Sequence, residues 1–219
     1  MTIMEAIEAR HAVRAYTDRK IDGEIETALR QAIEDANRES GLHIQLICDE
    51  PKAFDGMMAH YGNFKNCCNY LAIAGKPGSD EAVGYYGEKV VLTAQALELN
   101  SCWVAMSYSK GKVPCELSSG EKLQIVIALG YGETQGIPHK SKPIEALCKT
   151  DGSMPAWFKA GMEAALLAPT AMNQQKFCFT LKDSIVSAKA GLGFYAKMDL
   201  GIVKYHFELG AGKNNFKWA

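Results

Sequence analysis

One run of twenty residues, "EAVGYYGEKVVLTAQALELN" at 81–100, constrains the fold more than any other part of the sequence. Its length and apolar spacing predict a helix, and apolar residues occupy nearly all of its faces, which is typical of a buried helix. Other secondary structure must therefore cover it on several sides. The chain has 219 residues, of which 47% are hydrophobic, so it is long enough to build such a core.

Helices and strands are interleaved along the rest of the chain. Apolar residues at helical spacing predict further helices at 2–13, 22–40, 54–62, 154–170 and 199–212. Alternating or β-rich runs predict strands at 42–49, 69–76, 121–132 and 176–183. Because strict βαβ alternation is absent, the order predicts an α+β fold with a central, mostly antiparallel sheet covered by helices.

The element order also suggests an internal repeat. A helix, a loop, a strand and a second helix ending in "ALELNS" in the first half resemble the same order ending in "HFELGA" in the second. We therefore expect one domain over 1–219 with pseudo-twofold halves at about 1–110 and 150–219. A connecting strand and loop would occupy 111–149.

Charge and cysteine content exclude several classes of protein. Twenty-four basic and twenty-five acidic residues give a net charge of −1, so neither a nucleic acid nor a membrane surface is an expected partner, and any anion site must be local. Seven cysteines without a CxxC pair, and histidines without ligand spacing, predict free thiols in a reducing compartment and no metal site. The N-terminal run does not read as a signal peptide, and no apolar run approaches the roughly 20 residues of a membrane span, so we expect a cytoplasmic protein.

A local basic cluster stands at the end of the first expected helix. The run "EARHAVRAY" contains Arg10, His11 and Arg14. If the helix continued, the two arginines would share one face. Two interpretations are open: a solvated helix end whose cations the helix dipole favours, or a clamp in which guanidinium groups bind phosphate oxygens.

A second distinctive stretch is "LLAPTAMNQQKFCFTL" at 166–181. A helical pattern runs into Pro169, small and amide side chains follow, and an alternating run then predicts a strand. Taken alone, the stretch can be an ordinary helix exit.

Together these two stretches resemble the signature sequences of the nitroreductase family of FMN-dependent oxidoreductases. "RHAVRAY" at 10–16 is similar to the arginine motif of that family, and "APTAMNQQKFCF" at 168–179 to its later ring-binding motif. "ALELNSCWVA" at 96–105 and "IVIALGYGETQGIPHKSKP" at 125–143 resemble two further elements. The combination covers most of the chain.

The resemblance implies FMN as cofactor. It assigns the phosphate and ribityl contacts to Arg10 and Arg14, and a hydrogen bond with the polar edge of the flavin ring to Asn173. The full set of positions that correspond to FMN contacts is Arg10, His11, Ala12, Arg14, Asn63, Ala105, Met106, Lys140, Lys142, Pro169, Thr170, Ala171 and Asn173.

Four positions depart from the family pattern. Ala12 stands where serine is usual, and Met106 where glycine is usual. Lys176 replaces a proline and Phe177 a tryptophan. Ala12 removes one hydroxyl contact, for which only backbone can substitute, and the changes at Lys176 and Phe177 leave the ring geometry or the substrate shape open.

The activity that the resemblance implies is hydride transfer from NAD(P)H through the flavin to a nitroaromatic, a quinone or another small acceptor. The flavin carries this chemistry, so no catalytic acid or base is expected among the side chains. A flavin-binding protein without turnover, acting as a sensor or store, and a cofactor-free structural relative are the alternatives. NADH and NADPH are not distinguished, nor is the acceptor.

The position of the second motif is unusual. In ordinary members it lies within about the first fifty residues, where this chain has "ANRESGLHIQLI" at 36–47. Ordinary members are homodimers that complete each site with both subunits. The resemblance therefore implies a fused pseudo-dimer that is monomeric and binds one FMN, with a homodimer as the alternative.

Overall fold

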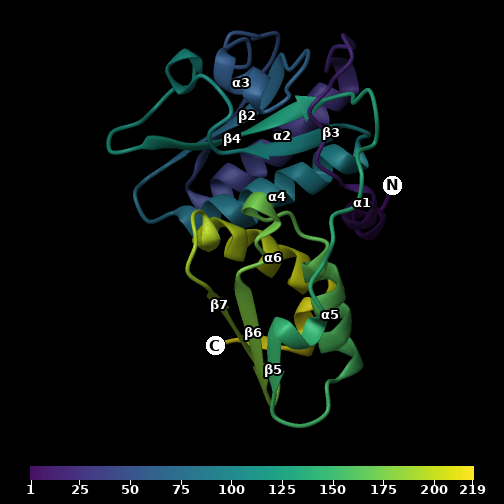
Figure 1. Cartoon of the computed structure of the whole chain (residues 1–219). Helices are drawn as coiled ribbons and strands as arrows, with labels where there is room; N and C mark the ends of the chain where they lie inside the picture. The colour runs from purple at the N-terminus through teal and green to yellow at the C-terminus, as the bar shows by residue number, and fades with distance from the viewer. The chain divides into compact units, whose positions relative to one another are not determined.

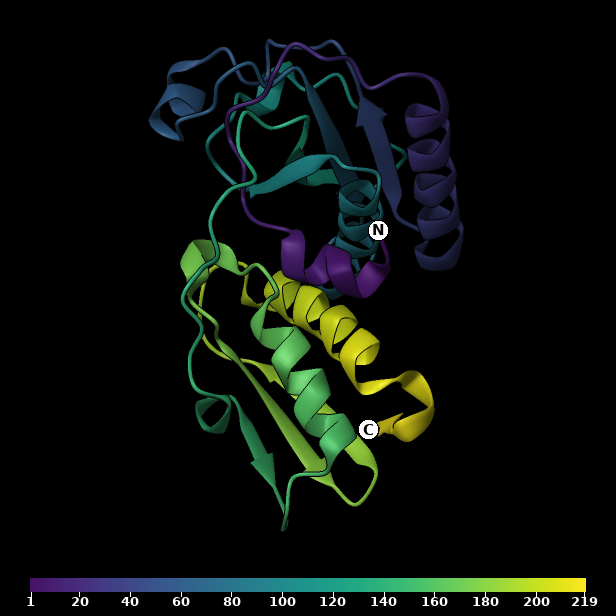
Figure 2. The same cartoon turned by 90° about the vertical axis from the view of Figure 1, so that its right-hand side faces the viewer.

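The computed structural model describes residues 1–219, which fall into two compact units. The first comprises Met1–Ser79 and Lys89–Pro138, and the second comprises Asp80–Glu88 and His139–Ala219. Each unit contains one four-stranded sheet; Figure 1 labels helices and strands, and Figure 2 traces the same chain after a turn of 90°. No helix combines the length and the apolar character that crossing a membrane would require.

The sheet of the first unit is antiparallel throughout, in the order β1-β2-β4-β3. Its strands are β1 (His43–Ile47), β2 (Asn69–Gly75), β3 (Asn100–Val104) and β4 (Lys122–Gly130). Its helical elements are α1 (Ile3–Ala9), α2 (Gly23–Ser40), α3 (Met57–Tyr61) and the short 3-10 helix η1 (Lys110–Lys112). The long helix α4 (Asp80–Ala96) contributes residues 80–88 to the second unit and 89–96 to the first.

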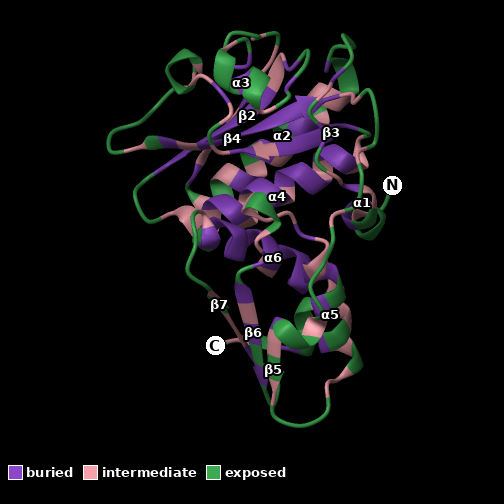
Figure 3. Cartoon of the chain, in the orientation of Figure 1, coloured by how far each residue is buried: buried purple, intermediate pink, exposed green.

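The two central strands form the core of the first unit. Residues 70–75 of β2 and 125–130 of β4 are buried without interruption, as the purple ribbons of Figure 3 show. Their sequences, "YLAIAG" and "IVIALG", are continuous apolar runs, which is the pattern of a strand covered on both faces.

Helix α2 follows its sequence pattern closely. Leu29, Ile33 and Ala36, which recur at helical spacing, are buried, and the helix ends at Gly41, whose φ of 69° is left-handed. The Asn37 side chain donates to the carbonyl of Ile44 at 2.9 Å and accepts from its N–H at 2.7 Å, which fastens the helix to β1.

The second unit has a mixed sheet in the order β5-β6-β7-β8. Strands β6 and β7 are antiparallel, whereas β5 pairs with β6 and β8 with β7 in parallel. The strands are β5 (Cys148–Thr150), β6 (Phe177–Lys182), β7 (Ile185–Ala190) and β8 (Lys217–Trp218). The helices are α5 (Ala156–Leu166) and α6 (Ala196–Ala211), with 3-10 helices η2 (Ile144–Ala146), η3 (Ala171–Asn173) and η4 (Lys213–Asn215).

Helix α6 is the centre of the second unit, and glycines let its neighbours approach it closely. A Cβ atom at Gly201 would lie 1.9 Å from the carbonyl oxygen of Glu81, and one at Gly84 would lie 1.9 Å from that of Met198. The first turns of α4 and the start of α6 are therefore in backbone contact. Helix α5 runs beside α6, as Figure 2 shows.

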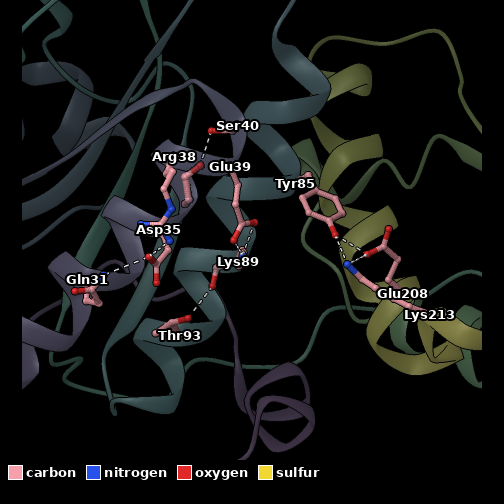
Figure 4. Close-up of polar contacts among 11 residues, drawn as sticks. Gln31, Asp35, Arg38, Glu39, Ser40, Tyr85, Lys89, Thr93, Glu208 and Lys213 are labelled. Atoms are coloured by element: carbon pink, nitrogen blue, oxygen red, sulfur yellow. Dashed lines mark hydrogen bonds and ion pairs between the residues drawn. The ribbon is translucent and has the colours of Figure 1, made fainter.

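Polar groups fasten the end of the chain to the same helix. The Tyr85 hydroxyl donates to Glu208, and the Lys213 ammonium contacts both side chains, as Figure 4 shows. The other carboxylate oxygen of Glu208 accepts from the Trp218 indole at 2.7 Å. The two residues of β8 are thus held by a side chain of α6 as well as by β7.

The α+β class is confirmed, with three corrections. The strands form two sheets instead of one central sheet. The first helix ends at Ala9, not near residue 13, because the backbone from Val13 onward hydrogen bonds to other segments. Strands β3, β5, β7 and β8 are additional; they are short or lack a strong apolar alternation.

The division into pseudo-twofold halves stays a prediction. A helix, two antiparallel strands and a helix follow one another twice, as α2-β1-β2-α4 with α3 between the two strands, and as α5-β6-β7-α6 with η3 before the first strand. The boundaries of the two compact units differ from those of the halves predicted at about 1–110 and 150–219.

Candidate functional site

The arginine segment, residues 10–16, is extended chain in the first unit. Arg10 caps α1 with φ −71° and ψ 113°, so Arg10 and Arg14 do not share a helix face. The Val13 N–H donates to the carbonyl of Ser101 at 3.0 Å. The Lys65 N–H donates to the carbonyl of Arg14 at 3.0 Å, and the Tyr16 N–H donates back to that of Lys65. The segment therefore runs between β3 and the loop that follows α3.

The side chains of this segment divide between core and surface. Arg10 is only 3% exposed, Val13 and Tyr16 are buried, and Arg14 and Ala12 are exposed. Burial raises the pKa of the Cys102 thiol, and the positive charges of Arg14 and Arg10 oppose that rise. Both guanidinium groups therefore act on the same region of the first unit.

Two loops that carry further candidates pack against each other in this unit. Asn63 follows α3 with a φ of 59°, and Ala105 and Met106 follow β3. A Cβ atom at the neighbouring Gly62 would lie 2.5 Å from the Cβ of Ser107. Since Lys65 also binds the arginine segment, the loops of Asn63 and Met106 lie in the same region as Arg14. Asn63 and Met106 are exposed.

The ring motif forms a tight turn in the second unit, between α5 and β6. Met172, Asn173 and Gln175 have φ values of 51°, 52° and 45°. Such left-handed conformations are uncommon for residues with a side chain and persist only where the surroundings hold them. The turn, residues 170–175, is therefore a built feature and not a relaxed helix exit.

Gln175 is the buried centre of this turn, with 3% exposure. Its N–H donates to the Thr170 hydroxyl at 3.1 Å. Its side-chain amide donates to the Lys140 carbonyl at 2.9 Å and to the Asn173 side-chain oxygen at 2.8 Å. Its side-chain oxygen accepts from the Lys142 N–H at 2.8 Å. Gln175 thus holds the turn together through Thr170 and Asn173 and joins it to the 139–142 loop through Lys140 and Lys142.

Asp199, near the start of α6, holds the other side of the turn. One carboxylate oxygen accepts from the Ala171 N–H at 3.0 Å, and the other from the Gln174 side chain at 2.7 Å. Burial raises the pKa of Asp199, and these two hydrogen bonds oppose the rise. The carboxyl is 3% exposed, so both bonds are shielded from water.

Asn173 and the two candidate lysines take part in the same network. The Asn173 amide donates to the Lys140 carbonyl at 2.8 Å. The Lys142 ammonium donates to the carbonyls of Gln174 and Gln175 at 2.8 and 3.1 Å. Asn173 and the Lys140 side chain are exposed. Asn173 keeps one amide hydrogen and one lone pair for an external partner.

The candidates predicted from the sequence fall into two groups, one in each unit. The first unit holds Arg10, His11, Ala12, Arg14, Asn63, Ala105 and Met106. The second holds Lys140, Lys142, Pro169, Thr170, Ala171 and Asn173. Sequence reasoning noted Gln175 only as one amide among several and missed Asp199, the only acid in the first turn of α6. No group of three or more His, Cys, Asp or Glu side chains could hold a metal ion.

The chemistry of both groups fits FMN. The first supplies two guanidinium groups, one of them exposed, as a phosphate requires. The second supplies a rigid turn of small residues with an exposed amide, as the polar edge of a flat ring requires.

Comparisons with known proteins agree on one fold. The family described as "Putative TM nitroreductase" matches residues 2–211. A "putative nitroreductase" from Thermotoga maritima MSB8 superposes with a TM-score of 0.67 and 20% identity, over 98% of this chain and 85% of that one. A "putative nitroreductase in complex with FMN" from Desulfovibrio desulfuricans gives 0.52 and 18%, over 67% and 95%.

A nitroreductase family protein from Streptococcus pneumoniae TIGR4 gives a TM-score of 0.51 and 14% identity, over 66% of this chain and 98% of that one. No curated protein matches the sequence. At these identities the solved structures show the fold, which is that of the nitroreductases.

Proposed function

Since the chain belongs to the family described as "Putative TM nitroreductase", we propose that it is an FMN-dependent oxidoreductase that passes hydride from NAD(P)H to a nitroaromatic, a quinone or another small acceptor. FMN, when bound, supplies the hydride chemistry, so the side chains are required to bind and orient rather than to act as acids or bases. The Desulfovibrio structure, described as a complex with FMN, supports the choice of cofactor.

The observation that carries the proposal is the construction of the 170–175 turn. Two buried polar side chains, Gln175 and Asp199, hold three residues in left-handed conformations and leave Asn173 exposed. An ordinary helix exit needs only a single left-handed residue, most often glycine. Left-handed residues with side chains are strained, and three of them in one turn favour a binding role over a simple helix exit.

We assign the polar edge of the ring to Asn173, with Pro169, Thr170 and Ala171 bringing backbone against it. The free hydrogen of the Asn173 amide would donate where negative charge develops as the flavin is reduced. Because Lys140 and Gln175 already hold this amide, it is oriented before the cofactor binds.

We assign the phosphate to Arg10 and Arg14, with His11 and Ala12 contributing through their backbone or short side chains. The resemblance also gives Lys140, whose side chain is exposed, as a candidate for the phosphate. The ammonium of Lys142 is engaged with two carbonyls of the turn, so we propose that it supports the ring site and contacts the cofactor less directly. Asn63, Ala105 and Met106 complete the proposed contacts.

Absorbance of the purified chain tests the function. The chain is mixed with FMN, separated from free cofactor and treated anaerobically with NADH or NADPH, with dithionite as the positive control for reduction. Retained flavin that either nicotinamide bleaches is the expected result. Flavin that only dithionite bleaches would indicate a binding protein without turnover, and failure to retain FMN would indicate a cofactor-free relative.

A further inference from the structure

The loop that joins β7 to α6, residues 191–194, exposes large apolar side chains. Its sequence is "GLGF", in which Leu192 is 94% exposed and Phe194 is 81% exposed. Met172 of the adjoining turn is also largely exposed. Apolar surface in water is unfavourable, and a cluster of it beside a proposed ligand site marks a contact surface.

This loop is fastened to the 170–175 turn. The Phe194 carbonyl accepts from the Gln174 side chain at 2.9 Å, and the Gly191 N–H donates to the Lys176 carbonyl at 2.8 Å. A Cβ atom at Gly193 would lie 2.4 Å from the Gln174 side-chain oxygen, so the loop backbone lies directly against that side chain. The backbone that carries the two apolar side chains is therefore held beside the proposed ring site.

A positive charge stands next to the loop. Lys176 is exposed, and its Cδ lies 3.0 Å from the position of a Cβ on Gly193. Its aliphatic stem thus covers the glycines of the loop while the ammonium extends into water, as long cationic side chains commonly do. An aromatic side chain and an ammonium group are presented by one short stretch of surface.

We propose that Leu192, Phe194 and Lys176 form the acceptor subsite and that it takes a planar aromatic acceptor carrying an anionic substituent. This inference rests on the proposed function. Phe194 would contact the ring of the acceptor, and Lys176 would pair with its anionic group. For a quinone the overall reaction is NAD(P)H plus a proton plus quinone giving NAD(P)⁺ plus hydroquinone, so two electrons and two protons reach the acceptor.

The test compares two quinones, 1,4-naphthoquinone and its 2-sulfonate, as acceptors for the FMN-loaded enzyme. In a ping-pong reaction kcat/KM for the acceptor reports only the oxidative half-reaction, so effects on NAD(P)H do not enter. Phe194→Ala should lower kcat/KM about tenfold for both quinones, in line with the loss of an aromatic contact of about 1.4 kcal/mol. Lys176→Gln should lower it about threefold to fivefold for the sulfonate alone, as expected for an exposed ion pair.

Two matched controls lie at the far end of the same hairpin. Lys182→Gln removes an exposed lysine at the end of β6, and Ile185→Ala removes an exposed apolar side chain at the start of β7. Neither should change kcat/KM for either quinone. Reoxidation by dioxygen, which has neither ring nor charge, should stay unchanged in all four variants.

Several outcomes would overturn the inference while the proposed function stands. One is wild-type bleaching by NAD(P)H together with unchanged quinone kinetics in Phe194→Ala. Another is an equal effect of Lys176→Gln on both quinones. A third is a dimer, seen by light scattering, that Phe194→Ala splits without a kinetic change, because the loop would then be a docking surface. A wild-type flavin that no nicotinamide bleaches would overturn the function and the inference together.

Discussion

Replacing Gly201 by alanine tests the close contact at the centre of the second unit. The added Cβ would lie 1.9 Å from the carbonyl oxygen of Glu81 and 2.6 Å from the amide nitrogen of Tyr85. Real Cβ atoms essentially never lie within 3.0 Å of such atoms, so the first turns of α4 and the start of α6 must separate by about 1 Å. Both atoms belong to the backbone of α4, so the clash cannot be relieved by a change of side-chain rotamer.

The expected loss of stability follows from two opposing effects. Overpacking against backbone belongs at the upper end of its usual range, about 3 kcal/mol. Alanine gains about 1 kcal/mol over glycine inside a helix. The net loss is therefore about 2 kcal/mol, which should lower the Tm of a chain of this length by about 4–8 °C.

Thermal and urea unfolding followed by circular dichroism would measure the loss. Gly111→Ala is the matched control, because an added methyl group there meets nothing within 4 Å and φ is not left-handed. Gly84→Ala, on the facing helix, should destabilise the chain as well, and the double variant should lose less than the sum because one separation relieves both clashes. A Gly201→Ala chain as stable as the Gly111→Ala control would refute the backbone contact.

Four further predictions concern the cofactor. Arg10→Ala should weaken FMN binding, measured by equilibrium titration, by roughly tenfold to a hundredfold. Binding of riboflavin, which lacks the phosphate, should be almost unaffected. Equal losses of affinity for the two ligands would show that Arg10 does not bind the phosphate. Asn173→Ala should lower the flavin reduction potential in an anaerobic redox titration more than it weakens binding; an unchanged potential would make Asn173 a purely structural residue. Burial raises the pKa of Asp199 above its ordinary value of 3.8, so the folded chain binds more protons at this carboxyl than the unfolded chain does. The free energy of unfolding should therefore fall as the pH rises from 3.8 toward the raised pKa. Urea unfolding measured across that pH interval should show the fall in the wild type and lack it in Asp199→Asn. Light scattering with flavin absorbance should find one FMN per monomer, and a tight homodimer that loses flavin on dissociation would contradict the fused pseudo-dimer.

Much of the fold could be predicted because local pattern and tertiary burial agree. The stripe of α2 and its glycine stop are both local signals, and β2 and β4 are continuous apolar runs bounded by polar residues or glycine. The strands that were missed have two to six residues and a weak pattern. Their pairing is set by neighbours distant in sequence, as when Lys217 and Trp218 pair with the start of β7.

The site was predictable only in part for a similar reason. The amino-acid sequence predicted a turn rich in amide side chains, but it did not show which of these amides is buried. Gln175 is the amide whose side chain bonds the backbone of both Lys140 and Lys142, more than thirty residues away in sequence, whereas the Asn173 side chain bonds only the Lys140 carbonyl there. Likewise, the helical spacing of Arg10 and Arg14 was overridden by backbone pairing with the distant Ser101.

The division of α4 between the two units has a consequence for the order of folding. Residues 80–88 leave the ribosome more than a hundred residues before α6 (Ala196–Ala211), the helix whose backbone they contact. At translation rates of about 5–20 residues per second, the apolar surface of residues 80–88 stays exposed for about 5–20 s before α6 has been synthesised. The second unit therefore completes its fold only after α6 has been synthesised, and a chain truncated before α6 leaves residues 80–88 without their packing partner.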